Sequence, residues 1–323
     1  MELQNYQKKN VEIIKKFIAF RKDNQDIEEK LNLSWSNWGF GMEPLEEAAK
    51  RLQKHNIKYI ELHGNRYGSD LGYDIKKAKK ILNDHNIKVA GVCGMVFPES
   101  EFSSNKPHVT QRCIDYFRRN IDMCAELGGS YILFTPGAVG RPEKYDDYEF
   151  DRAAEAIRKL GDYFINHNVR AAIEPVRSEE VSFCHTFAEA KRLIKTIDHP
   201  GIQHIAGDLF HMLVGEENIA STILEYKDML INLHIADTNR GALGRGFINL
   251  DLVLMALYLI GYNNDSCFCT PEPLGPGGNP YTAMYGKPDK EILDELVRQT
   301  ASYFYAREEE IFKASDEDLL KEY

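Results

Sequence analysis

The sequence predicts a (β/α)8 barrel, in which eight parallel strands form a ring surrounded by helices. The chain has 323 residues, of which 43% are hydrophobic and 11% aromatic, so it can bury one large core. Eight short apolar runs alternate with segments of helical periodicity. Each run is apolar throughout, which is typical of parallel strands covered by helices. Eight is the number of strands that closes such a barrel.

The predicted strands recur along the whole chain. They are LNLSW (31–35), YIELHG (59–64), KVAGVCGM (88–95), SYILFTPG (130–137), RAAIEP (170–175), IQHIAGD (202–208), LINLHIAD (230–237) and SCFCTPE (266–272). The loops that follow the strands of a barrel gather at one face and form its active site. The longest predicted loops, 96–107, 137–148 and 273–287, all follow strands. We therefore expect the functional site at that face.

The segments between the strands carry apolar residues at spacings of three and four, as amphipathic helices do. Examples are EPLEEAAKRLQKH (43–55), CIDYFRRNIDMCAEL (113–127) and FDRAAEAIRKLGDYFINH (150–167). Thr186 followed by Glu189 is a capping-box pattern, which predicts that a helix begins there.

Residues 1–30 precede the first predicted strand and are expected to form an N-terminal helical extension to a barrel of residues 31–323. One apolar stripe runs along this extension, formed by Val11, Ile14, Phe17 and Ile18. We expect the stripe to pack on the barrel floor or on another subunit, because the mixed charges around it disfavour a membrane surface. No linker rich in proline or serine divides the rest of the chain, so a single barrel domain is expected.

The composition argues against several partners. The chain has 40 Lys and Arg against 50 Asp and Glu, and its net charge of -10 repels nucleic acids and anionic membranes. Its six cysteines include no CxxC pair, and the opening MELQNYQKKN lacks a signal-peptide pattern, so we expect a reduced, cytoplasmic enzyme. The apolar runs are shorter than the roughly 18 to 20 residues of a membrane span.

Polar residues end the last four apolar runs, where the barrel mouth should lie. They are Glu174, Asp208, His234 and Glu272. Each alone has an ordinary explanation as a helix cap, a solvated group or a core histidine. Together they would bring three carboxylates and an imidazole into contact, and such close carboxylates raise one another's pKa unless a cation lies between them. We therefore expect these four residues to bind a divalent metal.

The expected ligand set is rich in oxygen and contains no thiolate. It favours Mn²⁺, with Mg²⁺ or Co²⁺ as alternatives, over a structural Zn²⁺. Other residues near the same strand ends suit a polyhydroxylated substrate: Glu180, His211, Arg240, His63 and Trp38. The Trp38 ring is suited to stacking on a sugar, although a packed plug at the barrel mouth is an equal interpretation.

The loop after the seventh predicted strand contains GALGRG, which has neither the dinucleotide-binding nor the P-loop arrangement. Its glycines are expected to let the chain turn tightly beside Arg240. Asp237, which lies between His234 and Arg240, is expected to support one of these two residues.

These motifs resemble the xylose-isomerase-like barrels that include sugar phosphate isomerases and epimerases, over residues 31 to 305. The ketose 3-epimerase pattern is matched by ExxxxxE at Glu174, by DxFH at Asp208, by HxxDxNRxxxGxG at His234 and by EP at Glu272. The resemblance implies that these four residues are metal ligands, with Glu174 and Glu272 also forming the acid/base pair. It further implies that the substrate oxygens bind to Glu180, His211 and Arg240.

Several segments resemble more closely the large subunit of bacterial C-glycoside deglycosidases, which work with a small β subunit on 3-oxo-glucosides. They are NLSWSNWGFG, ELHGNRYG, PGAVGRPEKYDD, CTPEPLGPGGNPY and the N-terminal helix. That group is thought to use a histidine in the loop after the fourth strand. Here the loop contains none, and Glu143 or Tyr145 stands at that place. The resemblance implies an oligomeric enzyme with a small partner subunit.

Both resemblances imply removal of the proton next to the carbonyl of a keto-sugar. The closer one implies a C-glycoside deglycosidase that expels the aglycone by β-elimination, and the other a ketose 3-epimerase or sugar (phosphate) isomerase working through an enediolate. A glycoside hydrolase would need two carboxylates and no metal. A DNA-repair endonuclease is disfavoured by the negative charge, and a non-catalytic role is open to any fold.

Overall fold

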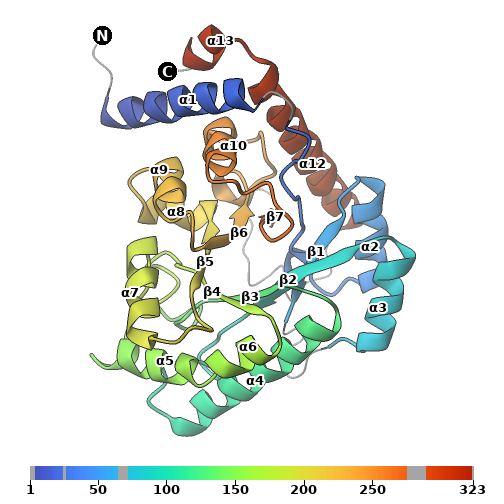
Figure 1. Ribbon diagram of the computed structural model, residues 1–323. Helices are drawn as coiled ribbons and strands as arrows, with labels where there is room; N and C mark the ends of the chain where they lie inside the picture. Colours follow the sequence, from blue (N-terminus) through green and yellow to red (C-terminus); the bar gives the residue numbers. More distant parts are fainter. Residues whose placement is uncertain (1–3, 25–26, 65–71, 275–288, 322–323) are drawn as a thin grey trace.

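The computed structural model describes residues 4–24, 27–64, 72–274 and 289–321, and it contains a parallel sheet of seven strands (Figure 1). The strands follow one another in the sheet in the order of the sequence, and every neighbouring pair is parallel. They are β1 (Tyr59–His63), β2 (Lys88–Gly94), β3 (Tyr131–Phe134), β4 (Arg170–Ile173), β5 (His204–Asp208), β6 (Leu230–Ile235) and β7 (Phe268–Pro271). This is the barrel architecture predicted from the sequence.

The first of the eight predicted strands, residues 31–35, forms isolated bridges rather than a regular strand. Leu33 pairs in parallel with Cys269 of β7, and Ser36 pairs in parallel with Glu61 of β1. The segment therefore touches both edges of the seven-stranded sheet and joins them. The predicted position of this segment in the ring is confirmed, but the segment does not form a continuous strand.

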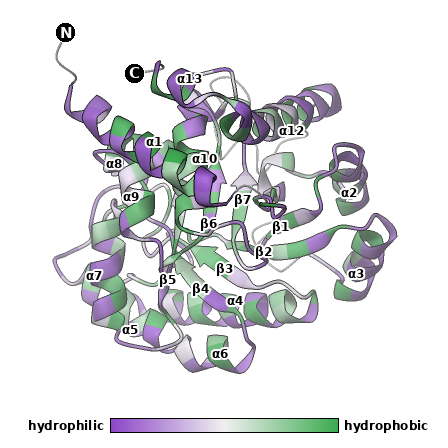
Figure 2. Cartoon of the chain, turned by 45° about the horizontal axis from the view of Figure 1, so that its top comes forward, coloured by the Kyte–Doolittle hydropathy of each residue, from purple (hydrophilic) through white to green (hydrophobic). Residues whose placement is uncertain are grey.

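Helices cover the outside of the sheet, and Figure 2 shows many of them with hydrophobic and hydrophilic residues on different sides. They are α1 (Asn5–Asp23), η1 (Asn37–Phe40), α2 (Leu45–Lys54), α3 (Ile75–Asp84), α4 (Pro107–Glu126), α5 (Glu149–Arg158), α6 (Gly161–Asn166), α7 (Phe187–Ile197), α8 (Leu209–Gly215), α9 (Ile219–Glu225), η2 (Thr238–Arg240), α10 (Leu250–Leu259), α12 (Lys290–Lys313) and α13 (Asp316–Lys321). Among them, α4, α6 and α7 contact strands of the sheet, as the spacing of three and four residues predicted.

The predicted helix start at Thr186 is confirmed. The Thr186 hydroxyl accepts a hydrogen bond from the Glu189 amide at 3.2 Å, which satisfies one of the free amides at the start of α7. The Glu189 carboxylate accepts from the amide of His185 at 2.6 Å instead of that of Thr186. The two side chains thus cap two amides, but not in the reciprocal arrangement of a capping box.

The apolar stripe of α1 packs against outer helices of the barrel. Phe17 is fully buried, and its ring lies 5.4 Å from that of Phe312 in α12 and 6.5 Å from that of Tyr258 in α10. The Arg21 guanidinium donates to carbonyl groups at the C-terminal end of α12, at 2.7 Å for Ala314. The stripe was expected to pack on the barrel floor or on another subunit, but the extension lies against outer helices on the side of the barrel.

Small residues in the barrel interior make room for large ones. Gly91 of β2 pairs with Tyr131 of β3, and a Cβ atom at Gly91 would lie 2.6 Å from the Tyr131 ring. Tyr131 is fully buried, so its ring has no open space into which it can move. The absence of a side chain at Gly91 is thus a packing requirement of this layer of the barrel.

Replacing Gly91 by alanine is expected to lower the free energy of unfolding by about 1–3 kcal/mol, because the new methyl group overpacks the Tyr131 site. Urea denaturation followed by circular dichroism measures the change. Gly137→Ala is the matched control, since the nearest atom to its Cβ would be a Phe183 ring carbon at 3.3 Å, compared with 2.6 Å at Gly91. Equal stability of the two variants would contradict this account of the packing.

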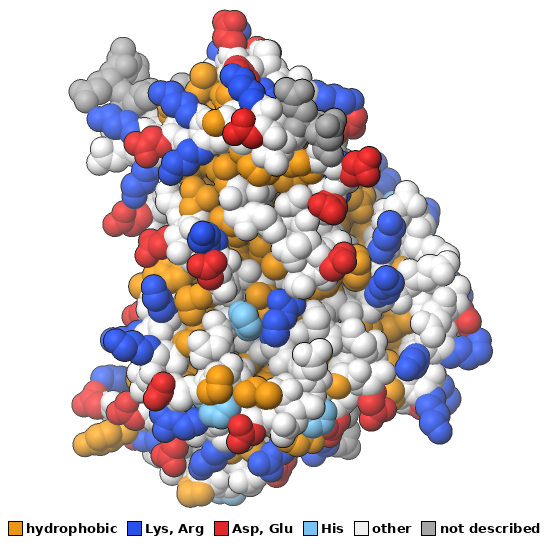
Figure 3. Space-filling view, in the orientation of Figure 1, with side chains coloured by type: hydrophobic (Ala, Val, Ile, Leu, Met, Phe, Trp, Pro, Cys, Tyr) orange, Lys and Arg blue, Asp and Glu red, His pale blue; other side chains and the backbone are white. Residues whose placement is uncertain are grey.

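The face of the protein in Figure 3 carries lysine and arginine side chains interspersed with aspartate and glutamate. Such a mixture differs from the basic stripe that binds a phosphate backbone. None of the helices in the described residues is both long and apolar enough to cross a membrane.

Candidate active site

The four predicted metal ligands lie at the C-terminal ends of adjacent strands. Glu174 follows β4, Asp208 ends β5, His234 lies near the end of β6 and Glu272 follows β7. The parallel register places Asp208 directly opposite His234. Asp208, His234 and Glu272 each offer one ligand atom, and these atoms lie within 4.8 Å of one another. Glu174 reaches the same group, since its Oε1 atom is 3.8 Å from His234 Nδ1.

Asp208 has an arrangement that fits a bound cation. Its Oδ1 atom accepts a hydrogen bond from the Phe210 amide at 2.8 Å and so caps α8. Its Oδ2 atom is buried and accepts no hydrogen bond from any group in the described residues. The nearest cationic group is Arg240, whose Nη2 atom is 3.7 Å away. A buried carboxylate oxygen without a donor is costly, and a divalent cation would remove that cost.

His211 belongs to a second group of potential ligands. Glu174, Asp208 and His211 also offer atoms within 4.8 Å of one another, and His211 Nε2 is 3.3 Å from Asp208 Oδ2. Burial, together with the positive charge of Arg240, lowers the pKa of His211 well below its usual value. The imidazole is therefore neutral and can accept a hydrogen bond or bind a cation as well as contact substrate.

Burial and crowding shift the protonation of the carboxylates. Burial and then the neighbouring negative charges raise the pKa of Glu174 well above its usual range. The same causes raise the pKa of Asp208 to about 8. Burial acts on Glu272 in the same direction, but the charges of His234 and Arg240 hold its pKa well below the usual value. Three carboxylates thus share two cationic partners, an imbalance that a divalent cation would relieve.

Glu61 contacts this group of residues, although no sequence motif predicted a role for it. It lies in the middle of β1, is fully buried, and its Oε1 atom is 2.9 Å from His234 Nε2. Burial alone would lower the pKa of His234, but the carboxylates of Glu272 and Glu61 raise it well above its usual value. The sequence did contain one signal for Glu61. It is an acidic residue in the middle of YIELHG, a run that is otherwise apolar enough for a buried strand.

Arg240 lies next to Glu272 in the site. Its guanidinium forms an ion pair with Glu272 and lies 4.4 Å from the ring centre of Phe210. Its backbone has a φ of 57°, and that of the preceding Asn239 is 58°. Two consecutive residues in the left-handed region are unusual for residues with side chains, and such backbone strain clusters at functional sites.

Asp237 holds the loop that presents Arg240. Its Oδ1 atom accepts from the amides of Thr238 and Ile248, at 2.8 and 3.2 Å, and its Oδ2 atom accepts from the Gly244 amide at 2.8 Å. A Cβ atom at Gly246 would lie only 2.1 Å from Asp237 Oδ1. One glycine of GALGRG is therefore needed for close packing against this carboxylate, and Asp237 supports Arg240 through the loop backbone.

A pocket at the C-terminal ends of the strands is lined by Glu174, His234 and Glu272. Trp38 and Glu180 line the same pocket. The Trp38 indole is 6% exposed, and its Nε1–H donates to Glu272 Oε2 at 2.7 Å. Glu180 is buried and accepts a hydrogen bond from Arg177 at 2.7 Å. Trp38 therefore orients a predicted ligand in this structure, a contact that sequence reasoning could not supply.

Two predicted substrate-binding residues are not among the residues that line this pocket. Glu143 is exposed on the loop after β3, where its carbonyl accepts a hydrogen bond from Arg141. Arg141 also pairs with two buried carboxylates, Glu101 and Glu149, which fixes that part of the loop. His63 is buried at the end of β1, and its amide donates to the Asn37 side chain at 2.8 Å.

Cys93 also lines the pocket but does not add a thiolate to it. Burial, followed by the nearby carboxylates of Glu61, Glu174 and Glu272, raises the pKa of the Cys93 thiol well above its usual value. The potential ligands in the described part of the chain are therefore carboxylate oxygens and imidazole nitrogens, a set that suits Mn²⁺, Mg²⁺ or Co²⁺.

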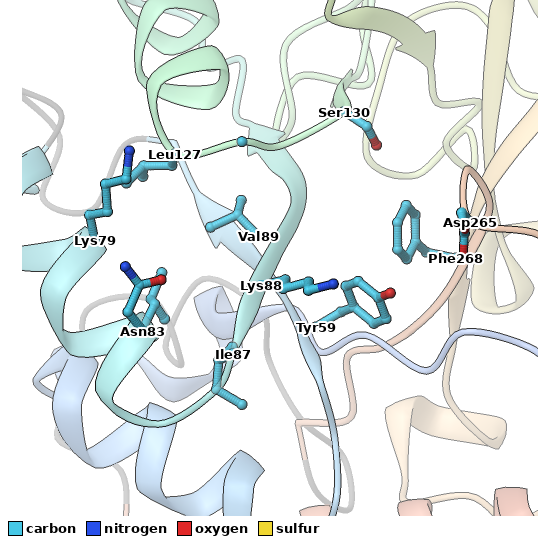
Figure 4. Close-up of a pocket in the computed structure, with 12 residues that line it drawn as sticks. Tyr59, Lys79, Asn83, Ile87, Lys88, Val89, Leu127, Ser130, Asp265 and Phe268 are labelled. Atoms are coloured by element: carbon cyan, nitrogen blue, oxygen red, sulfur yellow. The ribbon is translucent and has the colours of Figure 1, made fainter.

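A larger groove, of about 460 Å³, lies at the opposite end of the barrel (Figure 4). Its walls include Tyr59 and Phe268 at the starts of β1 and β7, with Lys79, Lys88 and Asp265 around them. The groups of potential metal ligands in the described residues all lie at the other end. The starts of barrel strands serve stability in most such enzymes, so the smaller pocket is the better candidate for chemistry.

Comparison with known proteins agrees with this fold. Residues 45–295 match the family model described as Xylose isomerase-like TIM barrel. Ketose 3-epimerase of Arthrobacter globiformis is 25% identical over 200 residues, which cover 61% of this chain and 68% of that protein. The 3-dehydro-D-guloside 4-epimerase of Escherichia coli is 27% identical over 154 residues, which cover 45% of this chain and 58% of that protein.

Among solved structures, D-allulose 3-epimerase from Methylomonas sp. in complex with D-allulose has a TM-score of 0.75 at 19% identity. The match covers 86% of this chain and 98% of that chain, so the two proteins share their fold over almost the whole of the smaller one. The family match spans well over half of the sequence and includes the ends of β4 to β7, where the four candidate ligands lie. The chain belongs to the xylose isomerase-like TIM barrel family.

Proposed function

We propose that the protein is a divalent-metal-dependent enzyme that epimerises a keto-sugar by removing the proton next to its carbonyl group. The observation that carries the proposal is the group formed by Glu174, Asp208, His234 and Glu272, in which a buried Asp208 oxygen lacks a donor. Mn²⁺ is the proposed ion, with Mg²⁺ or Co²⁺ as alternatives.

Glu174 and Glu272 are the proposed acid/base pair. They follow β4 and β7, so β5 and β6 lie between them in the sheet. Their carboxylates approach His234 Nδ1 to 3.8 and 3.2 Å, respectively. A substrate carbon held between them would lose its proton to one carboxylate and regain a proton from the other on its opposite face, which inverts that carbon.

A divalent cation held by the four ligands would supply Lewis-acid polarisation of the substrate carbonyl. The protein itself contributes the stabilisation of the developing negative charge through Arg240, which is buried beside Glu272. We assign the remaining substrate hydroxyls to Glu180 and His211, and the apolar face of the sugar to Trp38, all of which line the pocket.

The relatives support this chemistry and its substrate class. One is a ketose 3-epimerase and another is a 3-dehydro-D-guloside 4-epimerase, so both act on the configuration of a sugar. In each case the named carbon can lie next to a carbonyl group, which is the position from which a carboxylate base removes a proton. We therefore place the substrate among free ketoses and sugars that are oxidised at carbon 3.

A second candidate is β-elimination of the aglycone from a 3-oxo-glucoside, as in C-glycoside deglycosidases. The resemblance of NLSWSNWGFG and CTPEPLGPGGNPY to that group favours it, and so does the relative that acts on an oxidised glycoside. The two functions share proton removal and differ in whether a leaving group stands β to the carbonyl. A small partner subunit and an oligomeric state belong to this second proposal.

Turnover in D₂O is expected to place deuterium on the carbon next to the substrate carbonyl. The proton that returns to the sugar comes from the second carboxyl group, which exchanges its own proton with D₂O. Proton NMR of the products from free ketoses and from 3-oxo-glucosides, each assayed with Mn²⁺, measures the incorporation. The same samples separate the two candidates, because an epimer and a released aglycone have different spectra.

Each assay is run with and without any small protein that co-purifies with the chain. Activity that depends on this protein supports the deglycosidase candidate, and activity without it supports the epimerase. Turnover with neither deuterium exchange nor a primary isotope effect would contradict both, since both require proton abstraction.

A further inference from the structure

We infer that Glu61 is a positioning residue that holds His234 with its Nδ1 atom facing the proposed metal site. The inference rests on the proposed function, because it assigns a role toward the metal that Glu174, Asp208, His234 and Glu272 would bind. Glu61 itself lies deeper in the barrel and belongs to neither group of potential ligands in the described residues.

Three donors converge on the Glu61 carboxylate. Its Oε1 atom lies 2.9 Å from His234 Nε2, while its Oε2 atom accepts from the Tyr131 hydroxyl at 2.7 Å and from the Asn232 amide at 3.3 Å. Glu61 lies on β1, Tyr131 lies on β3, and Asn232 and His234 lie on β6, so the contacts join three strands of the ring. An ionised carboxylate can only accept, so this arrangement matches its hydrogen-bonding capacity.

The orientation of Asn232 is fixed in turn by β7. The Thr270 hydroxyl donates to Asn232 Oδ1 at 2.6 Å, which leaves the Asn232 amide nitrogen to face Glu61. Asn232 and His234 are two residues apart in β6, so both side chains project to the same side of the sheet. The network thus forms a polar layer directly below the histidine.

This contact determines which nitrogen of His234 can bind a metal. An imidazole that binds a metal has lost the proton from the binding nitrogen, so an N–H at Nε2 donated to Glu61 leaves Nδ1 as the nitrogen whose lone pair can bind. Nδ1 is the atom that lies 3.2 Å from Glu272 and 3.8 Å from Glu174. A carboxylate that accepts from the outer nitrogen fixes the ring and strengthens it as a ligand.

The place of Glu61 in the barrel argues against a purely structural role. The interior layers of such barrels are usually filled by branched apolar side chains. Here a fully buried carboxylate accepts a hydrogen bond from Tyr131, whose ring belongs to an apolar cluster that also contains Phe268. An apolar residue of similar size would generally be as stable or more stable at a buried position, so stability alone does not account for the carboxylate.

Glu61→Gln is expected to weaken Mn²⁺ binding by about 10- to 100-fold, because Gln offers a weaker acceptor and can turn its own N–H₂ toward His234. Titration of metal-free protein with Mn²⁺ in a calorimeter measures the dissociation constant without any substrate. Glu308→Gln is the matched control, since Glu308 is also buried and accepts from a tyrosine hydroxyl, that of Tyr258, at 2.7 Å. Its Mn²⁺ affinity should equal that of the unmodified protein.

A direct measurement on the unmodified chain does not depend on whether Glu61→Gln folds. In ¹⁵N-histidine-labelled protein loaded with diamagnetic Zn²⁺, NMR should show His234 bound to the metal through Nδ1 and protonated at Nε2. The His234→Asn spectrum identifies the signal by its loss. Tyr131→Phe, which removes one donor to Glu61 and keeps the ring, should weaken Mn²⁺ binding by a smaller factor than Glu61→Gln.

Metal bound through Nε2 of His234, or a folded Glu61→Gln protein with unchanged Mn²⁺ affinity, would overturn the inference. Both outcomes leave the proposed function intact, since the protein still binds the metal. An unmodified protein that binds no divalent ion would overturn the proposed function and this inference together. The two failures are therefore distinguishable in one set of titrations.

Discussion

Replacing Glu174 or Glu272 by glutamine is expected to reduce kcat by about 10²- to 10⁴-fold, the range that general acid–base catalysis contributes. Glutamine has nearly the same shape but can neither take up nor deliver the proton. In Glu272→Gln the side-chain oxygen can still accept from Trp38, so the pocket keeps one of its contacts. Steady-state rates on the substrate identified in the D₂O assays measure the loss.

The matched control for both variants is Glu179→Gln. Glu179 is exposed on the loop that follows Glu174, so the same chemical change there should leave kcat unchanged. Circular dichroism and thermal melting verify that Glu174→Gln and Glu272→Gln retain the fold. Retention of more than a few per cent of activity by both folded variants would contradict the assigned acid/base roles.

Removal of divalent metal by dialysis against a chelator is expected to abolish turnover, and Mn²⁺ is expected to restore it. Asp208, His234 and Glu272 each offer a ligand atom at this position, and the nearby Arg240 guanidinium is already paired with Glu272. Without the ion, the negative charge that develops on the substrate loses its main stabilisation. Unchanged turnover after complete chelation would support a metal-independent glycoside hydrolase instead.

Asp208→Asn tests the same site through stability. Asparagine keeps an oxygen to cap α8 but loses the anionic Oδ2 atom, so Mn²⁺ should stabilise the variant less than the unmodified protein. Saturation at 100 times the dissociation constant raises the free energy of unfolding by about 2.7 kcal/mol. Thermal melting at increasing Mn²⁺ measures the gain. Asp265→Asn, an exposed residue near the start of β7, is the control and should keep the full gain.

The sequence predicted most of the barrel because the information was local. Seven of the eight apolar runs form strands, and the helices between them follow the spacing of apolar residues. The exceptions depended on contacts between distant segments. Residues 31–35 form only isolated bridges, and α1 lies against α10 and α12 rather than on the floor. No local pattern specifies where an amphipathic helix finds its partner.

The sequence also predicted that the candidate ligands lie close together, and the barrel architecture explains why. Parallel strands end at one face, so a polar residue at the end of each run is brought to the same place. It could not predict that Glu143 would be exposed, because Arg141 orients its loop through the buried carboxylates of Glu101 and Glu149. It also missed Glu61, whose role depends on a histidine that lies 173 positions further along the chain.

The sequence by itself determined the fold class, the face that carries the site and the identity of the four candidate ligands, since these follow from apolar periodicity and strand ends. Only the tertiary structure decided how these groups are held: Glu61 below His234, Trp38 on Glu272, and Asp237 bracing the loop of Arg240. These contacts join residues from different strands and loops. They depend on the register and on backbone angles such as the positive φ of Arg240, which only the packed chain can fix.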